Sequence, residues 1–527
     1  MRPIPVLSQR RWSLWRRSLY AFAIIGGVVT SGLALSASNP GTVSKPGDAA
    51  PPAGYGLVLM PSNTGYLDPM IAEEGKSPFF PSRAMTDGRT LTPAMFDEPE
   101  FCAGCHLDIY NQWKNSMMAH AWDDPVYRSL LDLATKENDG KVDRFCVGCH
   151  SPVGLVTGEV KSTAGSFTDQ GLSKVSLAGV HCDVCHSISG AHGTGNGSFV
   201  LAPRMVGDRI KLGPRKDAMS PGHHTAYSEL HTRSEFCATC HNVTHPFNRM
   251  PIERTYDEWR DSPYNAQGVQ CQDCHMMPRP GVRRNPGKAS PLGKDRDSVY
   301  THGFVGGNVA VLVHLGADAQ AKLTREMLRS AATIELVELP RSIPAGGLAR
   351  LAVRVTNSGA GHKLPTGFPE GREVWIDLTV HDALGRQVYR LGAVKDGATE
   401  PGTKSFKVEL GDPKGNPVRV KAWEADRILF DTRIPPMGYA EEDYAFNVPR
   451  DARGPLTVRA RLNYWPFSPA FLKELMGDKA IRTERVEMAV TEGKIDVIPR
   501  NGEAVRTGRS AKAPAVRSAG QDQRPGY

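Results

Sequence analysis

Hydrophobic and polar residues alternate at period two along several stretches after residue 330. Successive side chains of a strand point to opposite faces, so this alternation predicts strands with one buried face. Turn signals such as DALGR and GDPKGNP separate the stretches. The pattern predicts an immunoglobulin-like β-sandwich over residues 331–498. Its alternating apolar positions are Leu351, Val353, Val355, Val374, Ile376, Leu378, Val380, Leu456, Val458, Ala460, Leu462, Val486, Met488 and Val490.

Before residue 330, the residues that share one face of a predicted element recur at a longer spacing than two. His106, Tyr110, Trp113, Met117 and His120 follow spacings of four, three, four and three, which predicts one face of an α-helix. At 1.5 Å per residue, His106 and His120 are then about 21 Å apart. With 40 prolines and 53 glycines the chain has many turns. We therefore predict a mostly helical, loop-rich domain over 96–330, and an α + β multidomain fold overall.

The N-terminus is typical of a targeting segment. Five arginines precede an uncharged stretch, SLYAFAIIGGVVTSGLALSAS, which ends in small residues. Residues 1–38 are therefore expected to be a cleaved signal peptide or a retained membrane anchor, since the apolar length fits both. We expect an exported protein, periplasmic or at the cell surface. The net charge of +8 falls to about +3 (8 minus 5) without those arginines, too little to indicate nucleic-acid binding.

Two further segments flank the predicted domains. Residues 39–95 form a lead-in rich in proline and glycine, and residues 499–527 form a tail rich in arginine, alanine and glycine. Such compositions do not supply a hydrophobic core, so the tail is expected to be disordered.

All ten cysteines fall in five CxxCH motifs, and none is left over. Zinc-binding or redox CxxC pairs would not require a histidine after each second cysteine. Successive motifs lie 34 to 55 residues apart, whereas zinc ribbons commonly place their pairs about 15–20 residues apart. CxxCH is the attachment motif of c-type haem. The motif residues are Cys102, Cys105, His106, Cys146, Cys149, His150, Cys182, Cys185, His186, Cys237, Cys240, His241, Cys271, Cys274 and His275.

The order of residues in CxxCH follows from the chemistry of haem attachment. Two thiols bond one haem covalently, and the adjacent histidine reaches the iron as the proximal ligand. We predict five covalently attached haem c groups, with iron held by His106, His150, His186, His241 and His275. The haems are expected to replace much of the core of residues 96–330.

Eleven histidines outside the motifs are candidates for the second axial position of each iron. We favour His120, one of the neighbours His223 and His224, His302, and His362 in the glycine-rich loop GAGHKLPTG. His181, His192, His231, His245 and His314 are weaker candidates, and His381 lies on the polar face of a predicted strand. Methionines beside the motifs, Met117, Met118, Met276 and Met277, are expected to pack against haem rather than bind iron.

At this point the sequence resembles a known group. FCAGCHLDIYNQWKNSMMAHAWDDPVY, GVHCDVCH, FCATCHNVTHP, TYDEWRDSPY with GVQCQDCHM, and THGFVGGN resemble the multihaem c-type cytochromes related to cytochrome c-554 and hydroxylamine oxidoreductase. GAGHKLPTG with REVW resembles a C-terminal domain of some members. The resemblance implies an exported electron carrier, and it implies that His120, His223 or His224, and His302 are distal ligands. Cytochrome c-554 has four haems and the oxidoreductase eight, so neither haem order is transferred to five motifs.

Two functions remain open from the sequence. In the first, mainly bis-histidine haems carry electrons between redox partners such as cytochromes or quinol-linked complexes. In the second, one haem lacks a distal ligand and acts on a small nitrogen compound, hydroxylamine or nitrite. We favour electron transfer and assign no catalytic residue. The β-sandwich is a further candidate surface for docking a partner.

Overall fold

The computed structural model describes residues 77–161, 167–203 and 209–499. The predicted targeting segment, most of the lead-in and nearly all of the tail lie outside these ranges. Within them, no helix is both long and apolar enough to span a bilayer.

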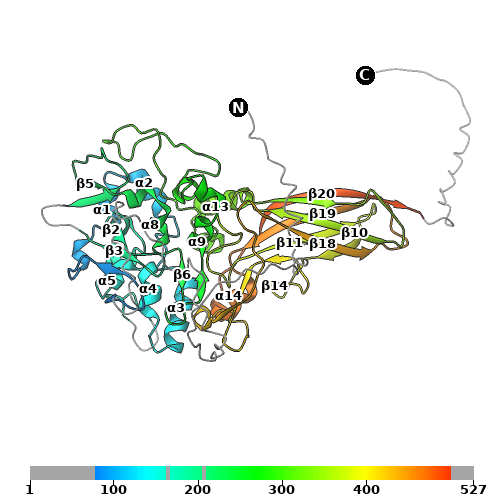
Figure 1. The fold of residues 1–527 in the computed structure, drawn as a ribbon, viewed down its shortest axis with the longest axis horizontal. Helices are drawn as coiled ribbons and strands as arrows, with labels where there is room; N and C mark the ends of the chain where they lie inside the picture. The colour runs from blue at the N-terminus through cyan, green and yellow to red at the C-terminus, as the bar shows by residue number, and fades with distance from the viewer. Residues whose placement is uncertain (1–76, 162–166, 204–208, 500–527) are drawn as a thin grey trace, which may run out of the picture. The chain divides into compact units, whose positions relative to one another are not determined.

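Short helices joined by loops make up the CxxCH region, residues 96–330 (Figure 1). They are α1 (Pro99–Ala103), α2 (Leu107–Trp113), α3 (Pro125–Glu137), α4 (Asp143–His150), α5 (Pro152–Val156), α6 (Lys174–Leu177), α7 (Cys182–Cys185), α8 (Ser234–Ala238), α9 (Thr255–Arg260), α10 (Pro263–Ala266), α11 (Gln272–His275), α12 (Val309–His314) and α13 (Asp318–Ser330). Small strands lie before or between them: β1 (Met85–Thr86), β2 (Ile188–Ala191), β3 (Phe199–Leu201), β4 (Ile210–Gly213), β5 (His224–Tyr227), β6 (Val243–Thr244) and β7 (Pro251–Glu253). The expectation of a mostly helical fold is not confirmed.

The helix predicted from residue 106 to 120 is shorter than its periodicity suggested. It begins at Leu107 and ends at Trp113. The side-chain amide of Asn115 donates to the carbonyl of Asn111, and the Ser116 hydroxyl accepts from the N–H of Ala119. Polar side chains that bond nearby backbone in this way compete with the helical ladder. His120 therefore lies in a turn, and the 21 Å spacing along one helix was wrong.

Long strands build the part of the chain after residue 330 (Figure 1). One sheet has the order β18-β10-β8, with β18 (Tyr439–Asn447), β10 (Leu348–Thr356) and β8 (Thr333–Glu338). The other has the order β12-β11-β19-β20-β9, with β12 (Gln387–Leu391), β11 (Glu373–His381), β19 (Leu456–Trp465), β20 (Val486–Ile498) and β9 (Ser342–Pro344), and β15 (Ser405–Phe406) pairs with β11. The remaining elements are β13 (Val394–Lys395), β14 (Ala398–Thr399), β16 (Val408–Gly411), β17 (Arg427–Asp431), α14 (Pro469–Met476) and the short 3-10 helices η4 (Ala422–Glu424) and η5 (Gly477–Lys479).

The apolar residues of the predicted alternating stretches form the core between these sheets. Val353, Val355, Ile376, Leu378 and Leu462 are fully buried, and they belong to one hydrophobic cluster. The β-rich C-terminal part is thus as predicted. The immunoglobulin-like strand order is not confirmed, and the sheet includes a parallel pair, β20 with β9.

The same hydrophobic cluster continues into the CxxCH region through α12 and α13, where Leu312 and Leu328 are buried. Polar contacts also join the two parts. The carboxylate of Glu258 on α9 accepts a hydrogen bond from Thr366 at 2.7 Å and pairs with Arg433 at 2.7 Å. The loop that carries His362 is therefore held against the CxxCH region.

Candidate haem-binding site

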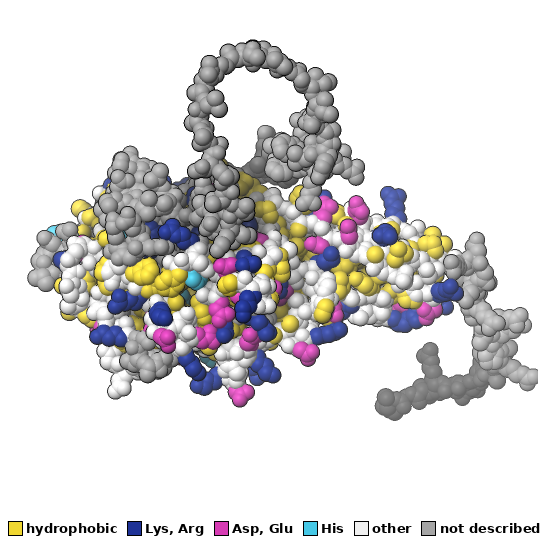
Figure 2. Space-filling view, turned by 60° about the horizontal axis from the view of Figure 1, so that its bottom comes forward, with side chains coloured by type: hydrophobic (Ala, Val, Ile, Leu, Met, Phe, Trp, Pro, Cys, Tyr) yellow, Lys and Arg dark blue, Asp and Glu magenta, His cyan; other side chains and the backbone are white. Residues whose placement is uncertain are grey.

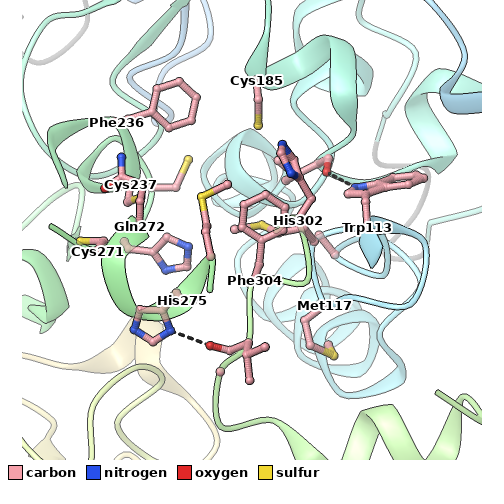
Figure 3. Close-up of a pocket in the computed structure, with 18 of the residues that line it drawn as sticks. Trp113, Met117, Cys185, Phe236, Cys237, Cys271, Gln272, His275, His302 and Phe304 are labelled. Atoms are coloured by element: carbon pink, nitrogen blue, oxygen red, sulfur yellow. Dashed lines mark hydrogen bonds between the residues drawn. The ribbon is translucent and has the colours of Figure 1, made fainter. Parts of the chain in front are cut away.

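All fifteen motif residues line one continuous cavity of about 2500 Å³. Figure 3 shows Cys185, Cys237 and Cys271 around the same hollow as His275 and His302. Pockets for single small molecules hold about 300–1,000 Å³, so this cavity has room for several large cofactors. Its thiols, imidazoles and apolar walls fit haem c. Met117, Met118 and Met276 also border it.

Four proximal histidines are oriented by their Nδ1–H groups. These groups donate to the backbone carbonyls of Ala289 from His106 at 2.7 Å, of Ala121 from His150 at 2.7 Å, of Leu212 from His186 at 2.6 Å and of Val305 from His275 at 2.5 Å. A carbonyl only accepts, so the proton is on Nδ1 and Nε2 keeps its lone pair. This is the usual way in which a protein fixes the tautomer of a metal-binding histidine.

Burial favours the neutral form of two proximal histidines and of His302. It lowers the pKa of His150 and of His275 to about 4, and that of His302 to about 3. Neutral imidazole is the form that binds a metal.

Three proximal histidines face a second imidazole across the cavity. The ring centroids of His106 and His223 lie 6.4 Å apart, those of His186 and His302 6.5 Å, and those of His275 and His362 6.2 Å. With a metal–nitrogen bond of about 2.0 Å and a ring radius of about 1.2 Å, two imidazoles on opposite sides of one metal have centroids about 6.3 Å apart. The three observed separations therefore fit bis-histidine haems.

The three opposed histidine pairs favour His223, His302 and His362 among the histidines predicted as second axial ligands. His223, not His224, faces His106, whereas His224 is exposed at the start of β5 and lies outside the cavity lining. His302 comes from the loop after the fifth motif but faces the third. His362 reaches the fifth motif from the C-terminal part of the chain. The Nδ1–H of His223 and of His362 donates to a backbone carbonyl, as in the proximal histidines.

Three weaker candidates use Nε2 for another bond. Their Nε2–H groups donate to the carbonyls of Arg83 from His192 at 2.7 Å, of Cys185 from His231 at 3.0 Å and of Trp423 from His245 at 2.9 Å. A nitrogen that carries a proton has no lone pair for iron. These bonds make Nε2 of all three histidines unavailable to iron. Nδ1 of His245 also accepts two backbone N–H groups, whereas Nδ1 of His192 and of His231 has no hydrogen-bond partner among the described residues.

His181 is buried beside the third motif, but its ring caps a helix. Its Nδ1 accepts the backbone N–H of Asp183 at the start of α7. An imidazole that accepts at Nδ1 carries its proton on Nε2, so this bond conflicts with iron binding through Nε2.

His120 does not border the cavity, and its Nδ1–H faces the carboxylate of Asp123 at 3.0 Å. His224, His314 and His381 also lie outside the lining. His120 therefore stays a prediction as a ligand. Among the described residues, His150 and His241 have no opposed imidazole of the kind seen for the other three motifs.

Cysteines of different motifs touch one another. Cys102 of the first motif lies close to Cys182 of the third, Cys149 of the second to Cys240 of the fourth, and Cys237 of the fourth to Cys271 of the fifth. Burial, and then the charge of Cys240, raise the pKa of the Cys185 thiol to about 12, which places the third motif beside the fourth. The five motifs therefore form one connected set, in which the fourth has three neighbours.

The proximal histidine of the fourth motif has a different partner from the other four. Its Nδ1 lies 4.0 Å from the carboxylate of Glu253. The Glu253 side chain is only 17% exposed, and it accepts a hydrogen bond from Thr255 at 3.0 Å. The carboxylate therefore places a negative charge beside the proximal imidazole of the fourth motif.

Replacing Glu253 by glutamine is expected to raise the midpoint potential of one haem. At about 8 Å and an effective dielectric of about 20, a carboxylate stabilises ferric iron by about 2 kcal/mol, or roughly 80 mV for one electron. A potentiometric titration of the variant beside the wild type measures this shift. Glu335→Gln, on the sandwich strand β8, is the matched control. An unchanged set of five potentials would rule out this role.

A buried ionic cluster lies beside the contact between the first and third motifs. The Lys211 ammonium contacts Asp97 at 2.8 Å and Asp183 at 2.6 Å, and both aspartates are at most 5% exposed. Burial acts to raise the pKa of Asp183, but the Lys211 ammonium and several hydrogen bonds hold it below its usual value. The charges of all three groups act on the Cys102 thiol, so the cluster is close to the first motif. Sequence reasoning missed these residues and Glu253, because no local pattern marks them.

One protein family and one solved structure are similar to parts of this chain. Residues 101–187 match the family described as cytochrome c554 and c-prime. A penta-haem cytochrome c552 from Thermochromatium tepidum has a similar structure, with a TM-score of 0.54 and 22% identity, over 77% of this chain and 100% of that chain. At this identity the likeness shows the fold alone.

Other solved structures are much less similar to this chain. The CARDB domain of a Pyrococcus furiosus protein has a TM-score of 0.15 and 11% identity over 32% of this chain and 86% of that chain, which is too low for any argument. No curated protein matches the sequence. The family match over residues 101–187 and the similar fold support a multihaem c-type cytochrome, which the five CxxCH motifs and their shared cavity also indicate.

Proposed function

We propose that this cytochrome carries electrons between redox partners through five covalently attached haems, at least three of them with two histidine ligands. One observation supports the proposal most: the five motifs line a single cavity, and their cysteines touch from motif to motif. Haem supplies reversible one-electron chemistry when bound. The cysteines and histidines of the motifs would hold the haems close together within this cavity.

The identity of the axial pairs is part of the proposal. His106 with His223, His186 with His302, and His275 with His362 would each hold one haem iron between two imidazoles. Two imidazoles saturate an iron, so these three sites do not bind substrate. Export to the periplasm or cell surface belongs to the same proposal, since haem c proteins of this kind are expected there.

An alternative function follows from the two other motifs. No opposed imidazole faces His150 or His241 among the described residues, and Tyr127 stacks on His150 at 3.6 Å between ring centroids. If one of these irons has an open position, the protein is an oxidoreductase for a small nitrogen compound, hydroxylamine or nitrite. His120 is the first candidate to close such a position.

Electron paramagnetic resonance of the oxidised protein, with carbon monoxide titration of the reduced form, separates the two functions. The electron carrier is expected to show five low-spin haems and no carbon monoxide binding. One high-spin haem that binds the gas, together with turnover of nitrite or hydroxylamine, would favour the oxidoreductase.

A further inference from the structure

The loop that carries His362 belongs to the β-rich part of the chain after residue 330, and several of its hydrogen bonds stay within that part. The side-chain amide of Asn357 donates to the carbonyls of His362 at 2.9 Å and of Ile434 at 3.1 Å. The backbone groups of Leu364 and Ile434 pair with each other at 2.9 and 3.0 Å. These bonds fix the shape of the loop, but they do not set its distance from the fifth motif.

A buried carboxylate on α9 joins this loop to the CxxCH region. Glu258 accepts a hydrogen bond from the hydroxyl of Thr366 at 2.7 Å, and its other carboxylate oxygen lies 2.7 Å from the guanidinium of Arg433. The Glu258 side chain is 5% exposed and that of Arg433 is 10% exposed. Glu258 therefore holds two residues of the β-rich part, one of them in the His362 loop itself.

Burial sets this ion pair apart from the pairs at the surface. Basic and acidic side chains are mixed on the face shown in Figure 2. Arg284 and Asp297 are such a pair, with side chains 71% and 94% exposed. Exposed pairs contribute little to stability, whereas removal of one partner from a buried pair leaves a charge without compensation. The contact between Glu258 and Arg433 is of the buried kind, so the loop is expected to respond to a change at Glu258.

Arg433 extends the contact to the residue after His362. Its guanidinium donates to both carboxylate oxygens of Asp431 at 2.9 Å, and Asp431 also pairs with Lys363 at 2.6 Å. Burial acts to raise the pKa of Asp431, but the two cations hold it at about 2. The Nδ1–H of His362 donates to the carbonyl of Lys363 at 2.9 Å. These charge pairs therefore lead from Glu258 to the residue that orients the imidazole of His362.

The helix α9 also contacts the segment that leads into the fifth motif. The indole N–H of Trp259 donates to the carbonyl of Val269, two residues before Cys271, at 2.9 Å. The backbone of Gly361 lies against the Trp259 ring, since a Cβ at Gly361 would be 3.6 Å from it. One short helix thus contacts both the segment before the fifth motif and the residue before His362.

We propose that Glu258 is a positioning residue for the fifth haem, which acts through Thr366 and Arg433 to keep His362 on the iron opposite His275. The inference rests on the proposed electron-transfer function, in which His362 is a ligand of this iron. Without the charge of Glu258 the loop leaves the iron in a larger fraction of molecules. A gas that binds only the open iron then binds with a higher apparent affinity, in proportion to that fraction.

Glu258→Gln keeps the shape of the side chain and removes its charge. The reduced, haem-loaded variant is expected to bind one carbon monoxide per chain more than wild type, with at least about a tenfold rise in apparent affinity at that haem. A gas titration followed by absorbance measures this binding. Electron paramagnetic resonance of the oxidised variant is expected to show a high-spin signal that added imidazole removes. Thr366→Val, which removes only a hydroxyl, is expected to change both readouts in the same direction.

Asp377→Asn is the matched control. Asp377 is a carboxylate that is 3% exposed and paired with Arg390 at 3.1 Å, but it joins β11 to β12 within the β-rich part. The apparent affinity of this variant for carbon monoxide is expected to stay within about twofold of wild type. Wild-type binding in both Glu258→Gln and Thr366→Val, or an equal gain in the control, overturns the positioning role.

The double variant H362A/E258Q separates this inference from the ligand assignment. If Glu258 acts through His362, the double variant binds no more carbon monoxide than His362→Ala alone. A further gain would place the effect of Glu258 elsewhere and overturn the inference. If His362→Ala binds no more gas than wild type, the ligand assignment of the proposed function fails as well. If His362→Ala gains a binding site and neither Glu258→Gln nor Thr366→Val does, the ligand assignment stands and only the positioning role fails.

Discussion

Replacing His362 by alanine is expected to convert one low-spin haem of the protein into a high-spin haem that binds one carbon monoxide per chain. The His362 and His275 rings are nearly parallel, at 15°, with centroids 6.2 Å apart. Removal of one imidazole leaves the iron of the fifth motif with a free position. Electron paramagnetic resonance and gas titration of the purified variant measure both changes.

Two further variants test whether the change in spin state depends on the imidazole of His362. His381→Ala, in the same part of the chain but outside the cavity lining, is expected to leave all spin states unchanged. His362→Met is expected to keep a low-spin iron and to raise one midpoint potential, as thioether ligands do. An H362A protein with wild-type spectra would show that His362 is not a ligand.

Replacing Lys211 by methionine is expected to destabilise the fold by about 3–5 kcal/mol, since it leaves the buried carboxylate of Asp183 without its cationic partner. Asp97 keeps a second partner, Arg209, at 3.2 Å. The variant retains two buried carboxylates, Asp97 and Asp183, without the ammonium that lies between them. Denaturant unfolding followed by circular dichroism gives the change in the free energy of unfolding. Lys211→Arg, which keeps the charge, and Lys494→Met on the surface are expected to cost much less.

The same cluster predicts a pH dependence. The pKa of Asp183 is depressed in the folded protein, so its contribution to stability is complete above its ordinary value of about 3.9 and is lost as the pH falls through the folded value. In Lys211→Met this acid-linked loss is expected to shrink, because the carboxylate no longer has the charge that depresses its pKa. An equal acid sensitivity in wild type and variant would contradict the assignment.

Local sequence predicted the cofactor attachment because CxxCH is itself local. The period-two stretches likewise predicted strands such as β10, β11 and β19, since side-chain alternation needs no distant partner. The order of the strands in the sheets could not be predicted from the sequence. The pairing of β20 with β9 joins residues more than 150 positions apart, and no local pattern encodes it.

Distal ligands depend on tertiary structure in the same way. His302 follows the fifth motif in sequence but faces the third, and His362 is 87 residues beyond the histidine that it faces. For His181, the role depends on which ring nitrogen accepts a hydrogen bond, and the sequence does not show that. The predicted helix through His120 ended early because polar side chains after Trp113 bond the backbone.

Anomalous scattering from iron in crystals of the haem-loaded protein tests the central claim most directly. The account predicts five iron positions in one connected group, with one iron between His106 and His223, one between His186 and His302, and one between His275 and His362. The position beside His241 is expected to have the irons of the second, third and fifth motifs as neighbours. Fewer than five irons, or irons bound away from these histidine pairs, would contradict it.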